Sequence, residues 1–366
     1  MPDAHAPADM IARLRLIRSD NIGPVTYFQL LARFGSAQAA LDAIPDLAAR
    51  GGGRAPRLVS RAQIEREIEA VERMGARYLF LGTAPYPPLL AELETAPPAL
   101  IVKGHVSLLD KPAIAIVGAR NASAAACRYA RQLAQSLGDR GTLIVSGLAR
   151  GIDTAAHDGS LDTGTVGVIA GGLDIFYPPE NEARQRAIAE RGLLIAEQPP
   201  GVEPRARHFP YRNRIIAGLG LATVVVEAAP RSGSLITARY AAEFGREVLA
   251  VPGSPLDPRA QGCNQLIRDG ATLIQTAEDV IESIAPGQIR PFRQPDRDYM
   301  LPDLSTDAEE RHRALVTGLL NPTPVPVDEI IRQSALPAPL VQTVLLELEL
   351  AGRLERHAGG KVSLAA

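Results

Sequence analysis

Residues 142–157 read TLIVSGLARGIDTAAH, and this stretch decides the fold class of the chain. A short apolar run ends at Ser146 and Gly147, and a turn then leads into a helical segment. Apolar runs without polar alternation are typical of strands that are buried on both faces of a parallel sheet. The stretch therefore predicts a strand, a glycine turn and a helix, in that order.

The same texture extends outward from about residue 76 to about residue 285. Short apolar runs alternate there with helical segments, which indicates βαβ units and a parallel sheet. The other runs are RYLFLG at 77–82, AIAIVG at 113–118, TVGVIA at 165–170, LLIAE at 193–197, LATVVVE at 221–227 and EVLAVPG at 247–253. We therefore expect an α/β protein whose core, residues 76–285, is an extended Rossmann-like domain.

A helical domain is expected at residues 1–75, where apolar residues recur at helical spacing. The turn DNIGPV at 20–25 separates two such segments, and the pattern loosely resembles a helix-hairpin-helix or SAM-like domain. A turn of that kind exposes amides to a phosphate. We favour a plain helical packing domain, because short motif matches often mislead. The stretch RGGGRAPR at 50–57 is predicted to be a flexible loop.

A linker and a third domain are expected after the core. Residues 286–306 are rich in proline and charge, which predicts a linker. Residues 307–366 contain three helical segments and a possible two-stranded wing around Gly359 and Gly360, which together predict a winged helix. The third helical segment has no basic residue before Arg353. We therefore favour a protein-interaction or structural role over reading of duplex DNA.

Composition limits the class of protein. The 366 residues carry a formal net charge of -2 and two cysteines, too few for a disulfide framework or a zinc knuckle. The sequence begins without the pattern of a signal peptide, and it contains no apolar stretch of about 18 residues. We expect a cytoplasmic protein with no membrane span, no metal and no cofactor.

One short stretch concentrates positive charge. RARHFPYRNR at 205–214 contains four arginines, a histidine and two aromatic rings. Cations beside flat rings suit single-stranded nucleic acid, whereas the alternative is a solvated loop with arginine stems packed on the rings. Phe209 either stacks on a base or lies in the core, and we favour the core. Arg214 is expected to pair inside the fold with a carboxylate such as Glu227. The candidates for DNA contact are Arg205, Arg207, Arg212 and Asn213.

Five glycine-bearing turns follow predicted strands, the fifth being LAVPGSP at 249–255, and in parallel α/β sheets such turns bind ligands. The first turn offers Gly118 and Arg120 to an anion, and the second offers Ser146, Gly147 and Arg150. A third turn, GGLDIFYPPEN, follows the run at 165–170. The fourth can present hydroxyls and amides to phosphate from Ser232, Gly233 and Ser234.

Some specific sites are not supported. Asp153 and His157 lie four residues apart, so a metal pair is conceivable, but a helix cap and a surface histidine are favoured because no third ligand is evident. The dinucleotide fingerprint is missing, since GLGLAT at 218–223 precedes a strand instead of following one. No GxxxxGK[ST] motif exists, so neither NAD nor the usual ATP site is indicated.

Seven motifs in a fixed order resemble one known family, the DNA-processing protein A (DprA/Smf) family. The motifs are GAR, SGLARGID, GGLDIFYPPEN, FPYRNRIIAGL, SGSLITARYA, REVLAVPG and GCNQLIRDGA. The resemblance is dense over residues 86–275. It implies a bacterial cytoplasmic protein of natural transformation and recombination that binds single-stranded DNA and forms homodimers. It also implies loading of the recombinase RecA onto DNA covered by single-strand-binding protein, and no enzymatic activity.

The resemblance also implies site residues. In the family, the arginine of the first glycine turn and the amides and hydroxyls of the second line a pocket for a DNA phosphate. These correspond here to Gly118, Arg120, Ser146 and Gly147, and the basic stretch corresponds to residues 205–214. Many relatives carry a lysine where this chain has Pro179, so Arg205 or Arg207 is a candidate to supply that charge.

Two other functions compete with a single-stranded DNA-binding mediator. The sheet and RSGSLITARYAAE also resemble nucleotide-processing hydrolases of the lysine-decarboxylase-like (phosphoribohydrolase) group, whose loop reads PGGxGTxxE. The second paired glycine is missing and Glu243 lies too far along, which argues against that activity. A transcription regulator using the winged helix is disfavoured by the lack of basic residues on its third helix.

Overall fold

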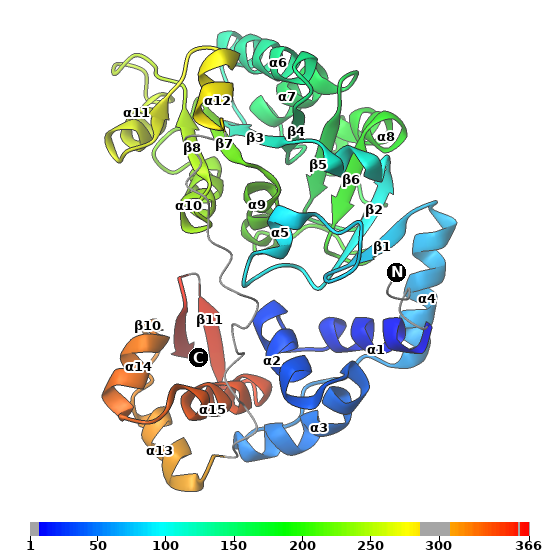
Figure 1. Ribbon diagram of the computed structural model, residues 1–366, viewed down its shortest axis with the longest axis vertical. Coiled ribbons are helices and arrows are strands. Elements are labelled where there is room, and N and C mark those ends of the chain that lie inside the picture. Colours follow the sequence, from blue (N-terminus) through cyan, green and yellow to red (C-terminus); the bar gives the residue numbers. More distant parts are fainter. Residues whose placement is uncertain (1–6, 286–307, 358, 366) are drawn as a thin grey trace. The chain divides into compact units, whose positions relative to one another are not determined.

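The computed structural model describes residues 7–285, 308–357 and 359–365 (Figure 1). The chain divides into two compact units, residues 67–292 and residues 1–66 together with 293–366. The two domains expected at the ends of the chain therefore belong to one unit, and the sheet-containing unit is inserted between them in sequence. The predicted linker at 286–306 lies outside the described residues.

The inserted unit, here called the sheet unit, is built on one nine-stranded sheet. Seven neighbouring strands run parallel, and they are β6, β5, β4, β3, β7, β8 and β9. At one edge β2 pairs antiparallel with β6, and β1 pairs antiparallel with β2. The order is β1 (Arg77–Phe80), β2 (Ala99–Gly104), β6 (Leu193–Ala196), β5 (Thr165–Ile169), β4 (Leu143–Ser146), β3 (Ala113–Gly118), β7 (Ala222–Val226), β8 (Glu247–Ala250) and β9 (Thr272–Leu273). Every predicted apolar run forms a strand, and the predicted α/β fold is confirmed.

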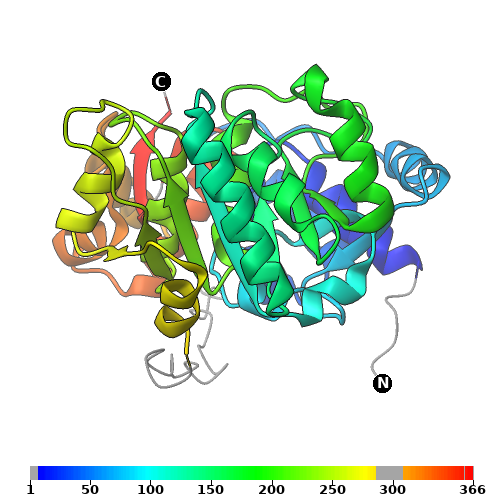
Figure 2. The same ribbon diagram turned by 90° about the horizontal axis from the view of Figure 1, so that it is seen from above.

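Helices cover both faces of this sheet. They are α5 (Pro88–Ala91), α6 (Ala124–Asp139), α7 (Ile152–Ser160), α8 (Glu182–Arg191), α9 (His208–Leu219), α10 (Ser234–Glu243), α11 (Gln261–Arg268) and α12 (Ala277–Ser283), with 3-10 turns at Val106–Asp110 and Pro179–Asn181. Figure 2 shows α6, drawn in teal, lying along the sheet. The alternation of side chains along each strand explains the two covered faces.

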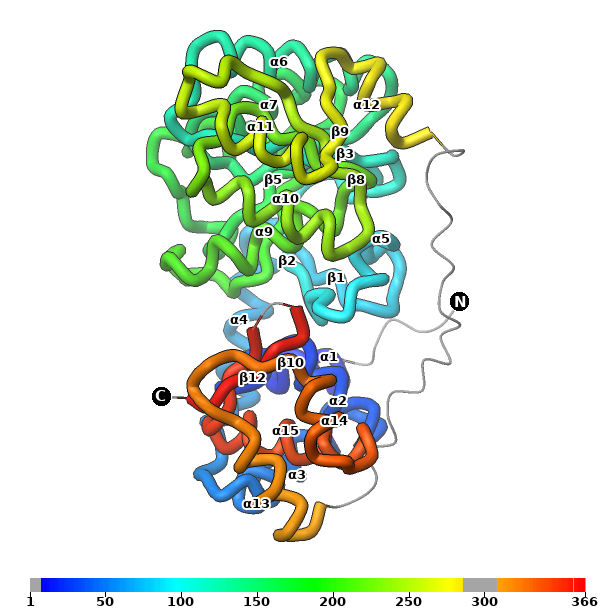
Figure 3. The backbone as a smooth tube through the Cα atoms, turned by 90° about the vertical axis from the view of Figure 1, so that its left-hand side faces the viewer, coloured from blue at the N-terminus to red at the C-terminus, as the bar shows by residue number. Residues whose placement is uncertain are grey.

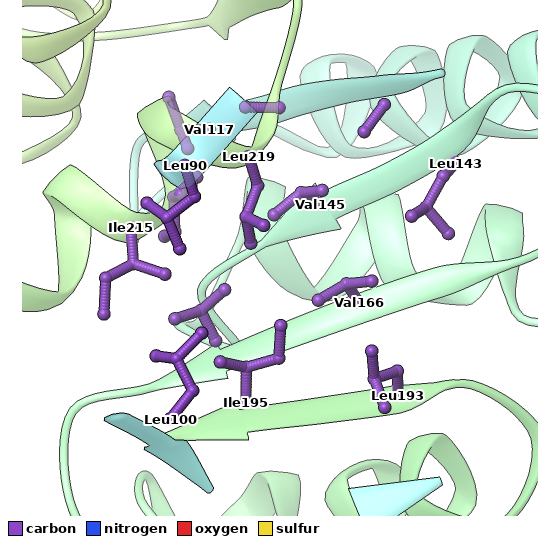
Figure 4. Packing of buried hydrophobic residues seen from close by; sticks show 14 of the residues in the cluster. Leu90, Leu100, Val117, Leu143, Val145, Val166, Leu193, Ile195, Ile215 and Leu219 are labelled. Carbon is purple, nitrogen blue, oxygen red and sulfur yellow. The ribbon is translucent and has the colours of Figure 1, made fainter. Parts of the chain in front are cut away.

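Strand β3 illustrates how the core is divided. Val117 packs in a cluster with Val145, Ile195 and Ile215 (Figure 4). Ile215 belongs to α9, so this cluster lies between the sheet and α9. Ile116, one residue earlier, packs in the opposite cluster with side chains of α6 and α7. Strands buried on both faces must be apolar at every position, which is the pattern found at 113–117.

The order of the strands defines where a ligand can bind. From β3 the chain builds β4, β5 and β6 toward one edge and then crosses to β7, β8 and β9 on the other side of β3. In open α/β sheets the crevice at such a reversal, outside the carboxyl ends of the strands, is the usual ligand site. The turns after β3, β4, β5 and β7 therefore meet at one edge of the sheet.

The second unit, here called the helical unit, combines both ends of the chain (Figure 3). Its first part contains α1 (Pro7–Arg18), α2 (Pro24–Phe34), α3 (Ala37–Arg50) and the start of α4 (Arg61–Arg73). Its second part is the predicted winged helix, with α13 (Glu310–Gly318), α14 (Val327–Ser334), α15 (Ala338–Leu350) and a three-stranded sheet of β10 (Val325–Pro326), β12 (Lys361–Leu364) and β11 (Leu354–His357). Among the described residues, no helix is both long and apolar enough to cross a membrane.

Candidate nucleic-acid interface

A pocket of about 370 Å³ lies at the carboxyl ends of β3, β4 and β5. Residues after each of these strands contribute to its wall, together with two side chains of α9. The lining residues are Arg120, Asn121, Gly147, Leu148, Ala149, Arg150, Tyr177, Pro178, Pro179, Phe209 and Arg212. The pocket thus joins the first three glycine turns to the basic stretch at 205–214.

The first turn brings Arg120 to the surface. A side chain at Gly118 would overlap the carbonyl oxygen of Val226 and lie 2.6 Å from Cγ1 of Ile152, so only glycine fits at the end of β3. The chain then enters α6, where the Ser123 hydroxyl accepts a hydrogen bond from the amide of Ala126. Between these two points Arg120 is exposed and reaches over the pocket.

The second turn already holds an anion of its own. Leu148 has a φ of 56°, and the amides on either side of it, those of Gly147 and Ala149, donate to the Asp153 carboxylate at 3.2 and 3.3 Å. Adjacent amides turned to one side form a nest that suits an anion. The Ser146 hydroxyl is buried and donates to the carbonyl of Ile116 at 2.6 Å. The amides and the hydroxyl of the second turn, which the family resemblance offers to phosphate, therefore have partners within the chain.

Asp153 lies inside the site and does not cap α7. The N-cap is Gly151, with a φ of 74°, and no side chain caps the helix. Burial raises the pKa of the Asp153 carboxyl, while the charge of Arg212 and the two amide donors act in the opposite direction. Asp153 thus accepts both amides of the turn from within the chain and faces Arg212.

Arg212 forms the floor of the pocket. Arg212 is only 5% exposed, and its Nη1 donates a hydrogen bond to the carbonyl of Val168 at 2.9 Å. The Nε is buried and, among the described residues, has no hydrogen-bond partner. Burial lowers the pKa of Arg212 to about 10 against the favourable charge of Asp153, so the guanidinium stays protonated at neutral pH. A buried donor without a partner costs free energy unless a ligand satisfies it.

Phe209 lies at the pocket, and the preference for a core position was wrong. The ring is half-buried, with the Arg120 guanidinium carbon 5.1 Å and the Arg212 guanidinium carbon 6.0 Å from its centroid. The ring of Tyr177, which is exposed, lies 5.6 Å away at an interplanar angle of 52°. Two rings and two cations therefore share one side of the pocket.

The other arginines of the site have different surroundings. Arg205 and Arg207 are exposed just before α9, and within the described residues neither forms an ion pair. Arg150 is exposed and pairs with Glu180. Arg214 is buried, as expected, but its partner is not the suggested one, since its Nη2 lies 2.6 Å from Oε1 of Glu197.

Glu227, the carboxylate suggested for Arg214, serves the first turn instead. Its Oε2 accepts a hydrogen bond of 2.6 Å from the amide of Ser123, and its Oε1 lies 3.5 Å from Nε of Arg259. Arg214 lies two residues after Arg212 on α9, and Glu197 directly follows β6. The sequence contains no signal for this choice, because both carboxylates follow a predicted strand.

The fourth turn stands beside the pocket and does not line it. The hydroxyls of Ser232 and Ser234 lie 2.7 Å apart, and Gly233 between them is exposed. Asn213 on α9 donates to the carbonyl of Gly233 at 3.3 Å, which ties this turn to the basic stretch. The structure thus brings Arg120, Gly147, Arg150 and Arg212 together, while Asn213 and the two serines extend the same edge beyond β7.

Of the residues that line the pocket, sequence reasoning assigned Arg120, Gly147, Arg150 and Arg212 to the site. Tyr177 and Asn121 were not proposed as contacts, and Asp153 was expected to be a cap. The rule that ligands meet the carboxyl ends of parallel strands could have indicated Asn121 and Tyr177, because both follow a strand end. Nothing in the sequence indicates the internal role of Asp153.

His157 is a buried core histidine and not a surface residue. It is 1% exposed, and its Nδ1 lies 2.7 Å from the hydroxyl of Thr165 on β5. Burial lowers its pKa from 6.5 to about 3. In the part of the chain that the structure describes, no three His, Cys, Asp or Glu side chains gather as a metal site would require.

His157 makes stability depend on pH. The unfolded histidine takes up a proton near its ordinary pKa of 6.5, whereas the folded one stays neutral to about pH 3. With respect to this residue, the free energy of unfolding is therefore highest above pH 6.5, and it falls as the pH drops toward 3. Between about pH 7 and pH 5 we expect a loss of about 2 kcal/mol from this residue, measurable by urea unfolding.

The matched variants are His157→Gln and, as control, His105→Gln at an exposed histidine. The first should reduce the slope of unfolding free energy against pH by close to one proton, and the second should leave it as in the wild type. Equal slopes for all three proteins would contradict the buried, neutral state of His157.

Three family models match this chain. The model for DNA recombination-mediator protein A matches residues 77–285, that for the DprA-like N-terminal HHH domain matches residues 7–70, and that for the DprA winged helix domain matches residues 301–360. Together they account for the sheet unit and both parts of the helical unit.

DprA and Smf proteins are also found among the curated relatives and the solved structures that are similar to this chain. The chain is 46% identical to DNA processing protein DprA of Streptococcus pneumoniae over 198 residues, covering 54% of this chain and 70% of the relative. It is 37% identical to Protein Smf of Escherichia coli over 307 residues, covering 83% and 82%. The X-ray structure of the pneumococcal DprA superimposes with a TM-score of 0.64 at 35% identity, covering 76% of this chain and 98% of that one.

A second solved structure is that of DNA processing protein A from Helicobacter pylori, described for its single-stranded DNA binding mode. It is similar to this chain with a TM-score of 0.52 and 29% identity, and the match covers 57% of this chain and 95% of that one.

Proposed function

Because this chain belongs to the DNA processing protein A (DprA/Smf) family, we propose that it binds single-stranded DNA at the pocket over β3, β4 and β5. The observation that carries the proposal is the buried, protonated guanidinium of Arg212 beneath Arg120 and Phe209, whose Nε finds no partner in the part of the chain that the structure describes. A cation that is costly to bury and incompletely hydrogen-bonded suits a pocket that an anion fills.

The charge balance favours a phosphodiester. Arg150 and Glu180 neutralise each other, and Asp153 offsets one of the two remaining cations, Arg120 and Arg212. One net positive charge matches the single negative charge of a phosphate in a DNA backbone. Because the amides of the second turn are occupied by Asp153, we expect the guanidinium groups to supply the phosphate contact.

The rings favour a single strand over a duplex. Phe209 and Tyr177 stand beside the two cations, so a base next to the bound phosphate can stack on a ring. Bases of a duplex are paired and stacked and cannot turn toward the protein in this way. Arg205 and Arg207, exposed before α9, extend the basic surface for neighbouring phosphates. Contacts to the backbone carry no base information, so sequence preference should be weak.

We further propose that the protein acts as a recombination mediator and not as an enzyme. It would hold incoming single-stranded DNA as a homodimer and pass it to RecA in the presence of single-strand-binding protein during transformation, which places the activity in the cytoplasm. Membership of the family and the description of its main domain as a recombination mediator support this proposal.

Replacing Arg120 tests the phosphate contact. We expect wild type to bind a fluorescent single strand of about 30 nucleotides with a slope of log K against log salt of about -3, for about four phosphates neutralised. Arg120→Ala should weaken binding roughly tenfold at low salt and make the slope shallower by about 0.7. Arg140→Ala also removes one positive charge, but at the far end of α6, and should bind the single strand as wild type does.

If Arg120→Ala and Arg140→Ala bind alike, the pocket is not the phosphate site. If wild type binds no single strand at low salt, the DNA proposal itself fails. The phosphoribohydrolase hypothesis would then be tested by measuring base release from nucleoside monophosphates.

Replacing Phe209 separates stacking from charge. Phe209→Leu keeps an apolar side chain but removes the ring, so affinity for the single strand should fall by about 1–3 kcal/mol while the salt slope stays the same. Tyr211→Leu, an exposed ring on the same helix that does not line the pocket, is the control. A lower urea midpoint for Phe209→Leu with unchanged affinity would show a core role instead.

Recombinase loading is tested on DNA already covered by single-strand-binding protein. Wild type should shorten the lag before RecA hydrolyses ATP on this DNA, and Arg140→Ala should do the same. Arg120→Ala should shorten it less, in proportion to its weaker DNA binding. A wild-type protein that binds the strand but leaves the lag unchanged would overturn the mediator role and leave the binding site standing.

A further inference from the structure

The third helix of the winged helix, α15, is buried nearly all round. A helix that enters a DNA groove must show a polar face to solvent, whereas a helix apolar on every side is a core helix. Here the buried positions follow one another along α15 with few gaps. They are Leu340, Val341, Thr343, Val344, Leu345, Leu346, Glu347, Leu348 and Leu350.

Two hydrophobic clusters share this helix. Val344 and Leu348 pack with the other helices and the wing of the winged helix. Leu346 and Leu350 pack instead with side chains of α1, α2 and α3, among them Tyr27. The α15 helix therefore completes the core of the N-terminal helices, although more than 280 residues separate Tyr27 from α15 in the chain.

The glycines after α3 form the seat for α15. A side chain at Gly51 would overlap the carbonyl oxygen of Glu347, and one at Gly53 would lie 2.7 Å from Cβ of Ala351. Neither glycine has the positive φ that favours glycine for conformational reasons, so the constraint is space. The expected flexibility of RGGGRAPR therefore does not explain Gly51 and Gly53, which allow two backbones to approach.

Polar contacts fix the register of this interface. Arg353, just after α15, donates from Nη1 to the carbonyl of Gly51 at 3.0 Å. Gln29 on α2 donates to Gln342 at 3.2 Å and accepts from Arg356 at 3.4 Å. Glu347, which is fully buried, pairs with Nε of Arg313 at 2.8 Å, so its charge is compensated within the unit.

From these contacts we propose that α15 is an interaction surface that the N-terminal helices of the same chain cover. The two segments approach each other closely at Gly51 and Gly53. The two ends of the chain fold as one body, and the face of α15 that a winged helix offers to the major groove is covered. The winged helix is therefore not a duplex reader in this protein. This inference does not depend on the proposed DNA site.

Hydrogen–deuterium exchange on the full-length chain tests the seat. Gly51→Ala adds one methyl group against α15, whereas Gly23→Ala adds the same group where nothing lies within 4 Å, and neither position has a positive φ. We expect Gly51→Ala to speed exchange roughly tenfold or more in both 37–50 and 338–350. Gly23→Ala should leave both segments as in wild type, and β4 should be unchanged in every variant.

Arg353→Ala covers the case in which Gly51→Ala fails to fold, because it removes the hydrogen bond to Gly51 without adding an atom. It should speed exchange a few-fold in α3 and α15 together. The proposal is overturned if Arg353→Ala affects only residues 308–357, or if Gly51→Ala matches Gly23→Ala.

Discussion

One buried cation, the guanidinium of Arg212, organises the edge of the sheet where the site lies. It contacts the end of β5 through the carbonyl of Val168, supports the turn after β4 at Gly147, and lies beside the Phe209 ring. Burying a charge is costly, and Asp153 compensates only part of that cost. The turns, the ring and the exposed Arg120 take their positions around this group, so the pocket depends on it.

The candidate pocket differs from a glycine-rich phosphate loop in the groups that it offers to an anion. In such a loop the backbone amides are free for the ligand, whereas here two amides of the β4–α7 turn already hold the Asp153 carboxylate. Side-chain cations are left to meet the ligand. Guanidinium groups suit a phosphodiester of a polymer, and they leave the position of each neighbouring base to the aromatic rings.

Each unit requires glycine at a close approach of two backbones, and the physical reason is the same in both. Gly118 lets the end of β3 approach β7, and Gly51 lets the end of α3 approach α15. In each case the atom that a side chain would overlap is a backbone carbonyl oxygen, which cannot move without disturbing a strand or a helix. Close approach of two backbones thus shapes the candidate pocket in one unit and joins the two ends of the chain in the other.

The sequence by itself determined the local elements. The apolar runs specify strands because a strand buried on two faces tolerates no polar position. Strand β2 at 99–104 has the same apolar pattern, but its run was not among the predicted strands. The glycine turns and RARHFPYRNR indicated residues that the structure brings to one edge of the sheet, since strand ends and local charge are visible in a single stretch. The winged helix was likewise predicted from helical spacing and a glycine-bearing wing.

Tertiary structure alone decided which of these groups meet. Arg212 and Val168 are 44 positions apart, and Arg353 and Gly51 are 302 positions apart, so no local pattern records either contact. The choice of Glu197 over Glu227 for Arg214, the position of Phe209 at the pocket and the burial of α15 all follow from packing between distant segments. Periodicity and composition describe what each segment can bury, whereas its partner depends on the folded geometry of the whole unit.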